Sequence, residues 1–215
     1  MPWIGQLQSL QWSEALTVAL GAYSLGCFCT GYYLLRWRTG QDVRQLGSGS
    51  VGARNIGRIL GRSGFLLTLL GDLAKGSLAV WAALHFARED WLVALAMLAA
   101  MAGHIWPAQL RFRGGKGIAT SLGALLVYDH HLAAAYVILF LAGFLMLRRS
   151  VLPGLFAFLC LPLVSTFLGQ PPLKAVEISV LAGLVLIAHR RNLVQELSHL
   201  VEHRQAHVDQ PPPKL

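Results

Sequence analysis

Two glycine-rich segments of this sequence carry the residue types best suited to binding a phosphate group. The segment RFRGGKG places Arg111, Arg113 and Lys116 around Gly114 and Gly115, with no acidic residue nearby. Glycine lets successive backbone N–H groups turn toward one point, and cationic side chains add positive charge there. We therefore predict a loop in which Gly114, Gly115 and Lys116 hold a phosphate, with Arg113 nearer the rim.

The segment GSGSVGARNIGR at 47–58 repeats this combination of glycines, small polar residues and arginines. A helix is expected to follow, and its N-terminus would add partial positive charge. Arg54 and Arg58 are four residues apart and would share one face of that helix. Taken alone, the segment is equally compatible with a flexible loop. Its candidate contacts to a phosphate are Ser48, Gly49, Ser50, Arg54, Asn55 and Arg58.

Polar residues also lie inside or at the ends of apolar segments. Asp72 and Lys75 are three residues apart, so they share a helix face and can pair, in either a structural or a site-supporting role. His189 and Asn192 have the same spacing, and His104 lies near the end of another apolar segment. A lone histidine is more often structural, but several polar groups at one membrane face favour a functional site.

Other reaction classes lack their motifs in this sequence. There is no GxSxG elbow and no GxxxxGK[ST] loop, so nucleotide hydrolysis is disfavoured. The residue five positions after His104 is Gln109, which excludes an HxxxxD acyltransferase arrangement there. No acidic pair and no metal-ligand cluster is visible, and we expect no metal site.

These residues must be positioned by membrane helices. Only 13% of the residues are charged and the mean hydropathy is +0.54, whereas soluble domains are nearer one-quarter charged. We predict an all-α integral membrane protein with about seven transmembrane segments, one of them too short to cross straight. The segments lie at 13–35, 64–86, 91–110, 117–128, 131–147, 151–168 and 173–189. Residues 1–200 form a single transmembrane domain, and 201–215 a polar, disordered tail.

The distribution of basic residues predicts the orientation. Of the 18 Lys and Arg residues, only Arg88 and Lys174 fall at the connections after the second and sixth segments, Lys174 at the very start of the seventh segment, and only Lys75 lies in the interior of a segment. The others follow the first, third, fifth and seventh segments. By the positive-inside rule this rich side is cytoplasmic, so the N-terminus lies outside and the C-terminus inside.

The order and spacing of these motifs resemble the bacterial acyl-phosphate:glycerol-3-phosphate acyltransferases, the PlsY family. That family carries GSGNxGATNxxR, then DxxKG, then GHxxPxxxxFKGGKGxAT, then HRxN. This sequence reads GSGSVGARNIGR at 47–58, DLAKG at 72–76, GHIWPAQLRFRGGKGIAT at 103–120 and HRRN at 189–192. The match covers nearly the whole chain, and the third motif is long and specific.

The resemblance implies transfer of a fatty acyl group from acyl phosphate to glycerol 3-phosphate, giving lysophosphatidic acid and phosphate in phospholipid biosynthesis. It implies no metal and no bound cofactor. It also implies a multi-pass protein of the bacterial cytoplasmic (inner) membrane, with its active site on the cytoplasmic side, membrane lipid as a partner and no nucleic acid. The chain-length preference and the oligomeric state do not follow from it.

The resemblance also implies residue roles. Arg58, Lys116, His189 and Asn192 look like groups that bind the phosphate and hydroxyl of the acceptor. Ser48, Gly49 and Asn55 look like contacts to the donor phosphate. Asn55, Asn192 and His189 are the candidate catalytic residues. His104 and Ser150 are further candidate substrate contacts.

The mechanism has two open forms. Backbone N–H groups of residues 47–55, with Asn55 or Asn192, would stabilise the oxyanion. The proton of the attacking hydroxyl passes either to an oxygen of the donor phosphate or to His189 or His104 as general base. The acyl tail is expected between helices or in lipid.

Two departures from the family motif keep alternative functions open. The family Asn is Ser50 here, and the family Thr is Arg54, which adds a guanidinium to a phosphate loop. These changes suit a related acyltransferase with a different polar acceptor. An anion permease is the other alternative, although the sequence has no convincing internal repeat of the kind common in transporters.

Overall fold

The computed structural model describes residues 12–208, and every regular element in that range is helical. The predicted all-α class is therefore confirmed. The elements, in chain order, are α2 (Trp12–Cys27), α3 (Thr30–Thr39), the short 3-10 helix η1 (Val43–Gln45), α4 (Ala53–Phe86), α5 (Asp90–Ile105), the 3-10 helix η2 (Ala108–Leu110), α6 (Ile118–Tyr128), α7 (His130–Leu147), α8 (Val151–Phe167) and α9 (Pro172–Val208).

The helices match the seven predicted segments. Five spans in the described part of the chain are long and apolar enough to cross a membrane: Trp12–Thr39, Ala53–Phe86, Asp90–Leu110, His130–Leu147 and Pro172–Val194. The other two predicted segments correspond to the shorter apolar helices α6 and α8. At a rise of about 1.5 Å per residue, the 11 residues of α6 cover roughly half of a hydrocarbon core. The short fourth segment is thus observed as predicted.

Close packing of the bundle relies on small residues. α2 packs against α5, and α4 against α6. A Cβ at Gly26 would overlap the backbone of Ala100, and one at Gly123 would overlap the backbone of Leu73. Small residues allow such close approach of helices, which drives helix association where lipid removes the hydrophobic effect.

The first predicted segment is not one helix. α2 ends at Cys27 and α3 begins at Thr30, so two residues interrupt the span. The interruption frees backbone carbonyl groups, which need partners at membrane depth. Gln109 Nε2 donates to the Cys27 carbonyl at 2.5 Å, and Lys75 Nζ donates to the Phe28 carbonyl at 2.8 Å. Side chains from distant parts of the chain therefore stabilise the break.

The helix of the second segment begins earlier than expected, at Ala53 rather than at residue 64. It is divided at Gly61, whose φ of 73° and ψ of −162° are open to glycine and strained for other residues. The piece before Gly61 carries Arg54 and Arg58, and the piece after it carries Asp72 and Lys75.

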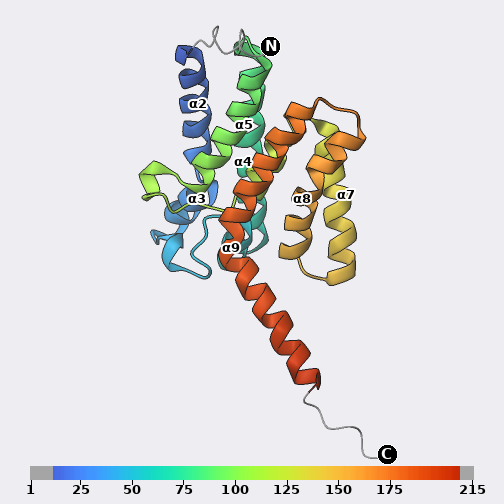
Figure 1. The fold of residues 1–215 in the computed structure, drawn as a ribbon. Helices are drawn as coiled ribbons and strands as arrows, with labels where there is room; N and C mark the ends of the chain where they lie inside the picture. The colour runs from blue at the N-terminus through green and yellow to red at the C-terminus, as the bar shows by residue number, and fades with distance from the viewer. Residues whose placement is uncertain (1–11, 209–215) are drawn as a thin grey trace, which may run out of the picture.

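Several connections lie at one or the other end of the bundle, whereas the one between α5 and α6 lies at mid-height (Figure 1). At one end the backbone N–H of Arg88 donates to Glu14, and Asp129 binds Lys174. The connections η1–α4 and α7–α8 lie at the opposite end (Figure 1). This alternation agrees with the predicted order of crossings, while the side of the membrane that each end faces stays a prediction.

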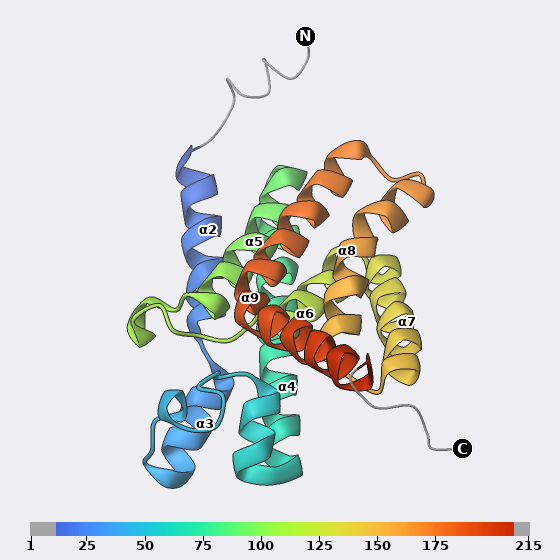
Figure 2. The ribbon, with the colours of Figure 1, turned by 60° about the horizontal axis from the view of Figure 1, so that its bottom comes forward.

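The C-terminal helix extends past the predicted end of the domain. α9 continues to Val208 and projects from the bundle, whereas a polar tail was predicted from residue 201 (Figure 1). Figure 2 shows this part of α9 crossing in front of the other helices when the bundle is viewed from its lower end. Residues 209–215 of the predicted tail lie outside the described residues.

Candidate active site

The first glycine-rich segment forms a compact loop built around Asn55. Gly47 and Gly49 have left-handed backbone angles, with φ of 57° and 71°. The buried amide of Asn55 accepts a hydrogen bond from the backbone N–H of Ser48 at 3.0 Å. Its Nδ2 donates to the carbonyls of Leu46 at 3.0 Å and Ser50 at 2.9 Å. One side chain therefore closes the loop.

These contacts change the interpretation of two predicted residues. An amide nitrogen has two hydrogens, and both of those on Asn55 are directed to backbone carbonyls. In this arrangement Asn55 holds the loop together, and a donation from Asn55 to an oxyanion would require one of these two bonds to open. Its catalytic role stays a prediction. The backbone N–H of Ser48 is likewise already bonded, to Asn55 Oδ1.

The start of α4 places positive charge beside this loop. Gly52 precedes the helix, and the first N–H groups of any helix lack intrahelical acceptors. Arg54 and Arg58 are exposed on this first stretch and line one groove, which confirms the predicted shared face. Ser50 Oγ accepts from the N–H of Gly52 at 3.3 Å, so this residue shapes the entry to the helix.

The second glycine-rich loop folds back on the end of α5. The N–H of Gly114 donates to the carbonyl of Ile105, and that of Gly115 to the carbonyl of His104, both at 3.0 Å. These carbonyls are ones that the helix end leaves unpaired. The two N–H groups are thus unavailable to a phosphate, and the predicted backbone cradle at Gly114 and Gly115 is not observed. A Cβ at either glycine would overlap atoms of His104.

Lys116 is the side chain around which the two loops and α9 converge. Its Nζ donates to Asn192 Oδ1 of α9 at 2.6 Å. Burial, followed by the nearby charges of Arg54 and Arg58, lowers the pKa of Lys116 from its usual value. Three cations from two separate segments therefore share one region, and such an arrangement favours a multiply charged anion.

His189 completes this region from α9. The ring is buried, and it is close enough to Lys116 for the two to interact electrostatically. Its Nδ1 lies 2.9 Å from the carbonyl oxygen of Val185, which can only accept, so Nδ1 carries the proton. Nε2 then keeps its lone pair and can accept a proton. The geometry is compatible with His189 as a general base.

His104 lies behind the second loop rather than in the cationic region. It is buried with Asp72 and Lys75, and Lys75 Nζ lies 3.0 Å from Asp72 Oδ1. The predicted pairing of Asp72 and Lys75 is confirmed. His104 Nδ1 lies 2.7 Å from Lys75 Nζ, so that ring nitrogen is an acceptor and is not free to take a substrate proton. Of the two histidines considered as bases, only His189 keeps an available lone pair.

Two cavities open next to these loops. One, of about 380 Å³, runs along α4 and combines cations with apolar side chains. Its lining residues are Arg54, Gly57, Arg58, Gly61, Arg62, Phe65 and Leu66. The other, of about 340 Å³, is lined by Asp42, Arg44, Gln45, Arg111 and Arg113. Arg113 is therefore at the exposed side of its loop, as predicted, and in a cavity separate from the one lined by Arg54 and Arg58.

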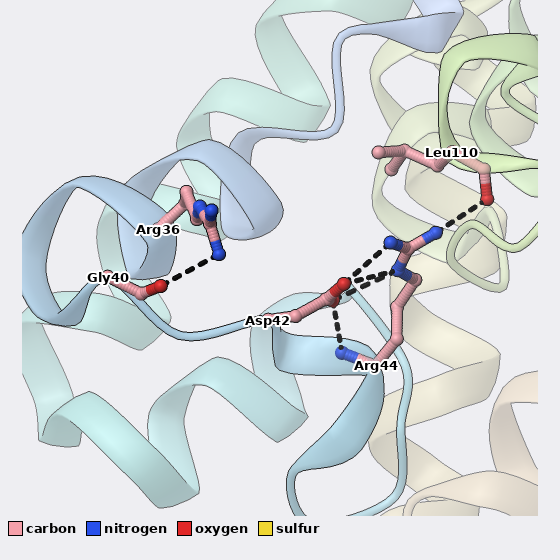
Figure 3. A network of polar contacts seen from close by, with 5 residues as sticks. All are labelled: Arg36, Gly40, Asp42, Arg44 and Leu110. Atoms are coloured by element: carbon pink, nitrogen blue, oxygen red, sulfur yellow. Dashed lines mark hydrogen bonds and ion pairs between the residues drawn. The ribbon is translucent and has the colours of Figure 1, made fainter.

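Arg44 is a residue that the sequence did not single out. Its guanidinium binds Asp42 and also donates to the carbonyl of Leu110 at 2.8 Å, so it joins the first loop to the second (Figure 3). Arg36 closes the end of α3 by donating to the Gly40 carbonyl at 2.7 Å (Figure 3). The sequence signal was the Asp-x-Arg spacing of 42–44, in which Asp42 caps a short helix.

Ser150 stays apart from these contacts in the described structure. It is the residue before α8, at the connection from α7, and its side chain makes no capping hydrogen bond there. The connection lies at the same end of the bundle as the first glycine-rich loop (Figure 1). Its role as a substrate contact remains a prediction.

Comparison with known proteins identifies close relatives over most of the chain. A family model described as glycerol-3-phosphate acyltransferase matches residues 16–199. Glycerol-3-phosphate acyltransferase 1 of Desulfitobacterium hafniense (strain Y51) is 45% identical over 191 residues, which make up 88% of this chain and 94% of that protein. Glycerol-3-phosphate acyltransferase of Synechococcus sp. (strain CC9902) is 40% identical over 185 residues, 86% of this chain and 92% of that protein.

Two crystal structures share the fold. One is PlsY (YgiH), an integral membrane glycerol 3-phosphate acyltransferase, in its glycerol 3-phosphate form. It has a TM-score of 0.79 and 31% identity, covering 86% of this chain and 92% of that chain. The lysophosphatidic acid form of PlsY has a TM-score of 0.78 and 29% identity over the same shares. The helical fold of this chain therefore matches that of an integral membrane protein of known structure.

Proposed function

Because this chain belongs to the glycerol-3-phosphate acyltransferase family, we propose that it transfers a fatty acyl group from an acyl phosphate to glycerol 3-phosphate. The products are lysophosphatidic acid and inorganic phosphate. The observation that carries this proposal is the convergence of Arg54, Arg58 and Lys116 with Asn192 of α9. Those side chains form a site for a phosphate dianion beside apolar helices.

The acceptor phosphate is assigned to Lys116 and Arg58. Lys116 is half-buried and is held in place by Asn192. A hydrogen bond to a charged group contributes roughly 1.5–3 kcal/mol. Binding a dianion among these cations also relieves their mutual repulsion, which is one cause of the lowered pKa of Lys116.

The donor is assigned to the groove along α4. Next to Arg58, its cationic side chains Arg54 and Arg62 suit the phosphate of an acyl phosphate, and its apolar part, at Phe65 and Leu66, suits the first carbons of an acyl chain. The rest of the chain would lie along the lipid-facing surface of the bundle. The extra guanidinium of Arg54 then strengthens donor binding rather than requiring another acceptor.

The reaction needs one nucleophilic displacement. A hydroxyl oxygen of glycerol 3-phosphate attacks the acyl carbonyl carbon, the bond from that carbon to the phosphate oxygen breaks, and phosphate leaves. The hydroxyl proton goes either to an oxygen of the departing phosphate or to Nε2 of His189, which keeps a lone pair. Holding both substrates in this geometry supplies several kcal/mol of the lowered barrier.

The two proton routes differ in their pH dependence. A histidine base gives an acid limb in the rate near the pKa of that histidine, and this limb disappears in His189→Gln. Transfer to the departing phosphate leaves the acid side of the profile unchanged in His189→Gln. A rate profile that keeps its acid limb in His189→Gln would exclude His189 as the base.

The site is assigned to the cytoplasmic face of a bacterial cytoplasmic (inner) membrane. Most of the basic residues of this multi-pass protein follow the first, third, fifth and seventh apolar segments, and the two glycine-rich loops belong to these connections. The positive-inside rule assigns such basic connections to the cytoplasm. Both the charged acceptor and the head of the donor would then arrive from the cytoplasm.

The experiment that tests the proposal is phosphate release by the purified protein in proteoliposomes. Acyl phosphate is supplied with and without glycerol 3-phosphate, and with glycerol as an acceptor that lacks a phosphate. We expect phosphate release that depends on glycerol 3-phosphate and is weak with glycerol. Equal release in all three conditions would contradict acyl transfer to this acceptor.

A further inference from the structure

A buried charged cluster lies directly beneath the second glycine-rich loop. Asp72, Lys75 and His104 are 1%, 5% and 2% exposed, so none of the three reaches solvent to any extent. Charged side chains at membrane depth are costly and occur mainly where they serve a purpose in the protein interior. The acyl transfer described above does not use any of these residues directly.

The contacts of Lys75 define the cluster. Its Nζ donates to the carbonyl of Phe28 at 2.8 Å, lies 2.7 Å from Nδ1 of His104, and lies 3.0 Å from Oδ1 of Asp72. The contact to Asp72 is an ion pair rather than a well-directed hydrogen bond, because Oδ1 has no hydrogen-bond partner among the described residues. Asp72 is thus the counter-ion of the Lys75 ammonium group.

The tautomer of His104 follows from this arrangement. A protonated lysine has only donors, so Nδ1 of His104 must accept the contact at 2.7 Å. The ring proton is therefore on Nε2. Without Lys75 the ring could carry its proton on either nitrogen and could turn about its side-chain bonds.

His104 in turn determines where the loop lies. Its backbone carbonyl accepts the N–H of Gly115, and its Nε2 is the atom that a Cβ on Gly115 would overlap. Gly115 is bonded directly to Lys116, whose Nζ reaches Asn192. A shift or rotation of the His104 ring is therefore transmitted to the backbone that carries Lys116.

We propose that Lys75 and Asp72 are positioning residues for the reaction: they fix His104 with its proton on Nε2, and His104 holds Gly115 so that Lys116 points at the acceptor phosphate. This inference rests on the proposed acyl transfer to glycerol 3-phosphate. A change in Asp72 or Lys75 should therefore affect binding of glycerol 3-phosphate more than binding of acyl phosphate. The reason is that the loop carries Lys116, whereas the groove along α4 receives the donor.

A purely structural ion pair would stabilise the bundle without affecting the acceptor. The double variant Asp72→Val/Lys75→Met distinguishes the two roles, since it removes both charges together and leaves no unpaired buried ion. Replacing a buried pair by apolar residues is often neutral for stability. In the positioning role, the folded double variant should still raise the KM for glycerol 3-phosphate about tenfold or more, with the KM for acyl phosphate changed less than about twofold.

The matched control is Asp129→Asn/Lys174→Met at the opposite end of the bundle. There Lys174 Nζ lies 2.6 Å from Asp129 Oδ2, in another ion pair between separate parts of the chain. This control should leave the KM for both substrates unchanged, whatever its effect on heat stability. An unchanged KM for glycerol 3-phosphate in folded Asp72→Val/Lys75→Met would overturn the positioning role.

A spectroscopic measurement tests the same inference independently of activity. Nitrogen-15 NMR of full-length, histidine-labelled protein reports which ring nitrogen is protonated, and the His104→Asn variant identifies the His104 signals. We expect the proton on Nε2, and a proton on Nδ1 would overturn the inference even if the double variant fails to fold. If the unmodified protein showed no transfer to glycerol 3-phosphate while His104 had the expected tautomer, the proposed function would fail and the fixed tautomer would stand.

Discussion

Removing the charge of Lys116 gives the sharpest mutational test of the cationic region. Lys116→Met keeps most of the length and apolar character of the stem while removing the ammonium group. The matched variant is Arg113→Met, in the same loop three residues earlier. Arg113 is exposed and lines a different cavity from Arg54 and Arg58.

The expected magnitude follows from the surroundings of Lys116. The ammonium is half-buried, is fixed by Asn192 at 2.6 Å, and lies near two arginines that also face the site. A contact between this group and a phosphate should contribute roughly 1.5–3 kcal/mol, which corresponds to roughly a 10- to 150-fold loss of kcat/KM for glycerol 3-phosphate. Arg113→Met should cost much less, because salt screens an exposed charge over about 10 Å at 0.1 M.

The assay is initial-rate kinetics in proteoliposomes at fixed acyl phosphate and varied glycerol 3-phosphate. Both variants are first compared with the unmodified protein for membrane insertion and heat unfolding. If the cations serve only to orient the chain in the membrane, the two variants will behave alike and leave the acceptor KM unchanged. Equal, small effects in folded protein would refute the assignment of Lys116 to the acceptor phosphate.

Three further outcomes are expected. Burial lowers the pKa of Lys116, so the cation that binds the acceptor is lost as pH rises through that lowered pKa. The KM for glycerol 3-phosphate, measured across alkaline pH, should therefore begin to rise at a lower pH than it would for an exposed lysine. The same pH profile in Lys116→Met would contradict this. Gly115→Ala should raise the acceptor KM at least about tenfold because its Cβ would overlap a buried ring, whereas Gly21→Ala, with open space at its Cβ, should be kinetically silent; similar kinetics for the two would remove the steric argument. Cysteine at Gln170 should be labelled from outside intact cells and cysteine at Arg148 only after the membrane is opened; outside labelling at Arg148 would reverse the orientation.

The sequence predicted those features that depend on local spacing. Seven apolar stretches predicted the helices, including the short one that became α6. The separation of three residues between Asp72 and Lys75 predicted their ion pair, since helix geometry alone brings such side chains together. The cationic character of the 54–58 and 111–116 segments was visible directly.

Features that depend on distant partners could not be predicted. The break after Cys27 lies inside a continuous apolar run, and it is stabilised by Gln109 and Lys75 from other helices. The N–H groups of Gly114 and Gly115 are bonded to carbonyls at the end of α5, so in this structure they do not form the expected cradle. Asn55 has the residue type of an oxyanion donor, but its hydrogens are already bonded within the loop.

The assignment of roles within a motif thus required the hydrogen-bond partners. The residue type shows which atoms can donate a hydrogen bond, and the structure shows which of those donors are already bonded to other protein atoms. His104 and His189 show the difference most clearly, because the same side chain has Nδ1 as an acceptor in one and as a donor in the other. Arg44, which links the two loops, was counted only among the residues that set orientation.

The most direct test of the central claim is product formation from labelled glycerol 3-phosphate with acyl phosphate as the acyl donor. Purified protein in proteoliposomes should convert the label to lysophosphatidic acid, identified by mass, and release about one phosphate for each acyl group transferred, as the displacement at the acyl carbon requires. Phosphate release without labelled lysophosphatidic acid would contradict acyl transfer to glycerol 3-phosphate at this site.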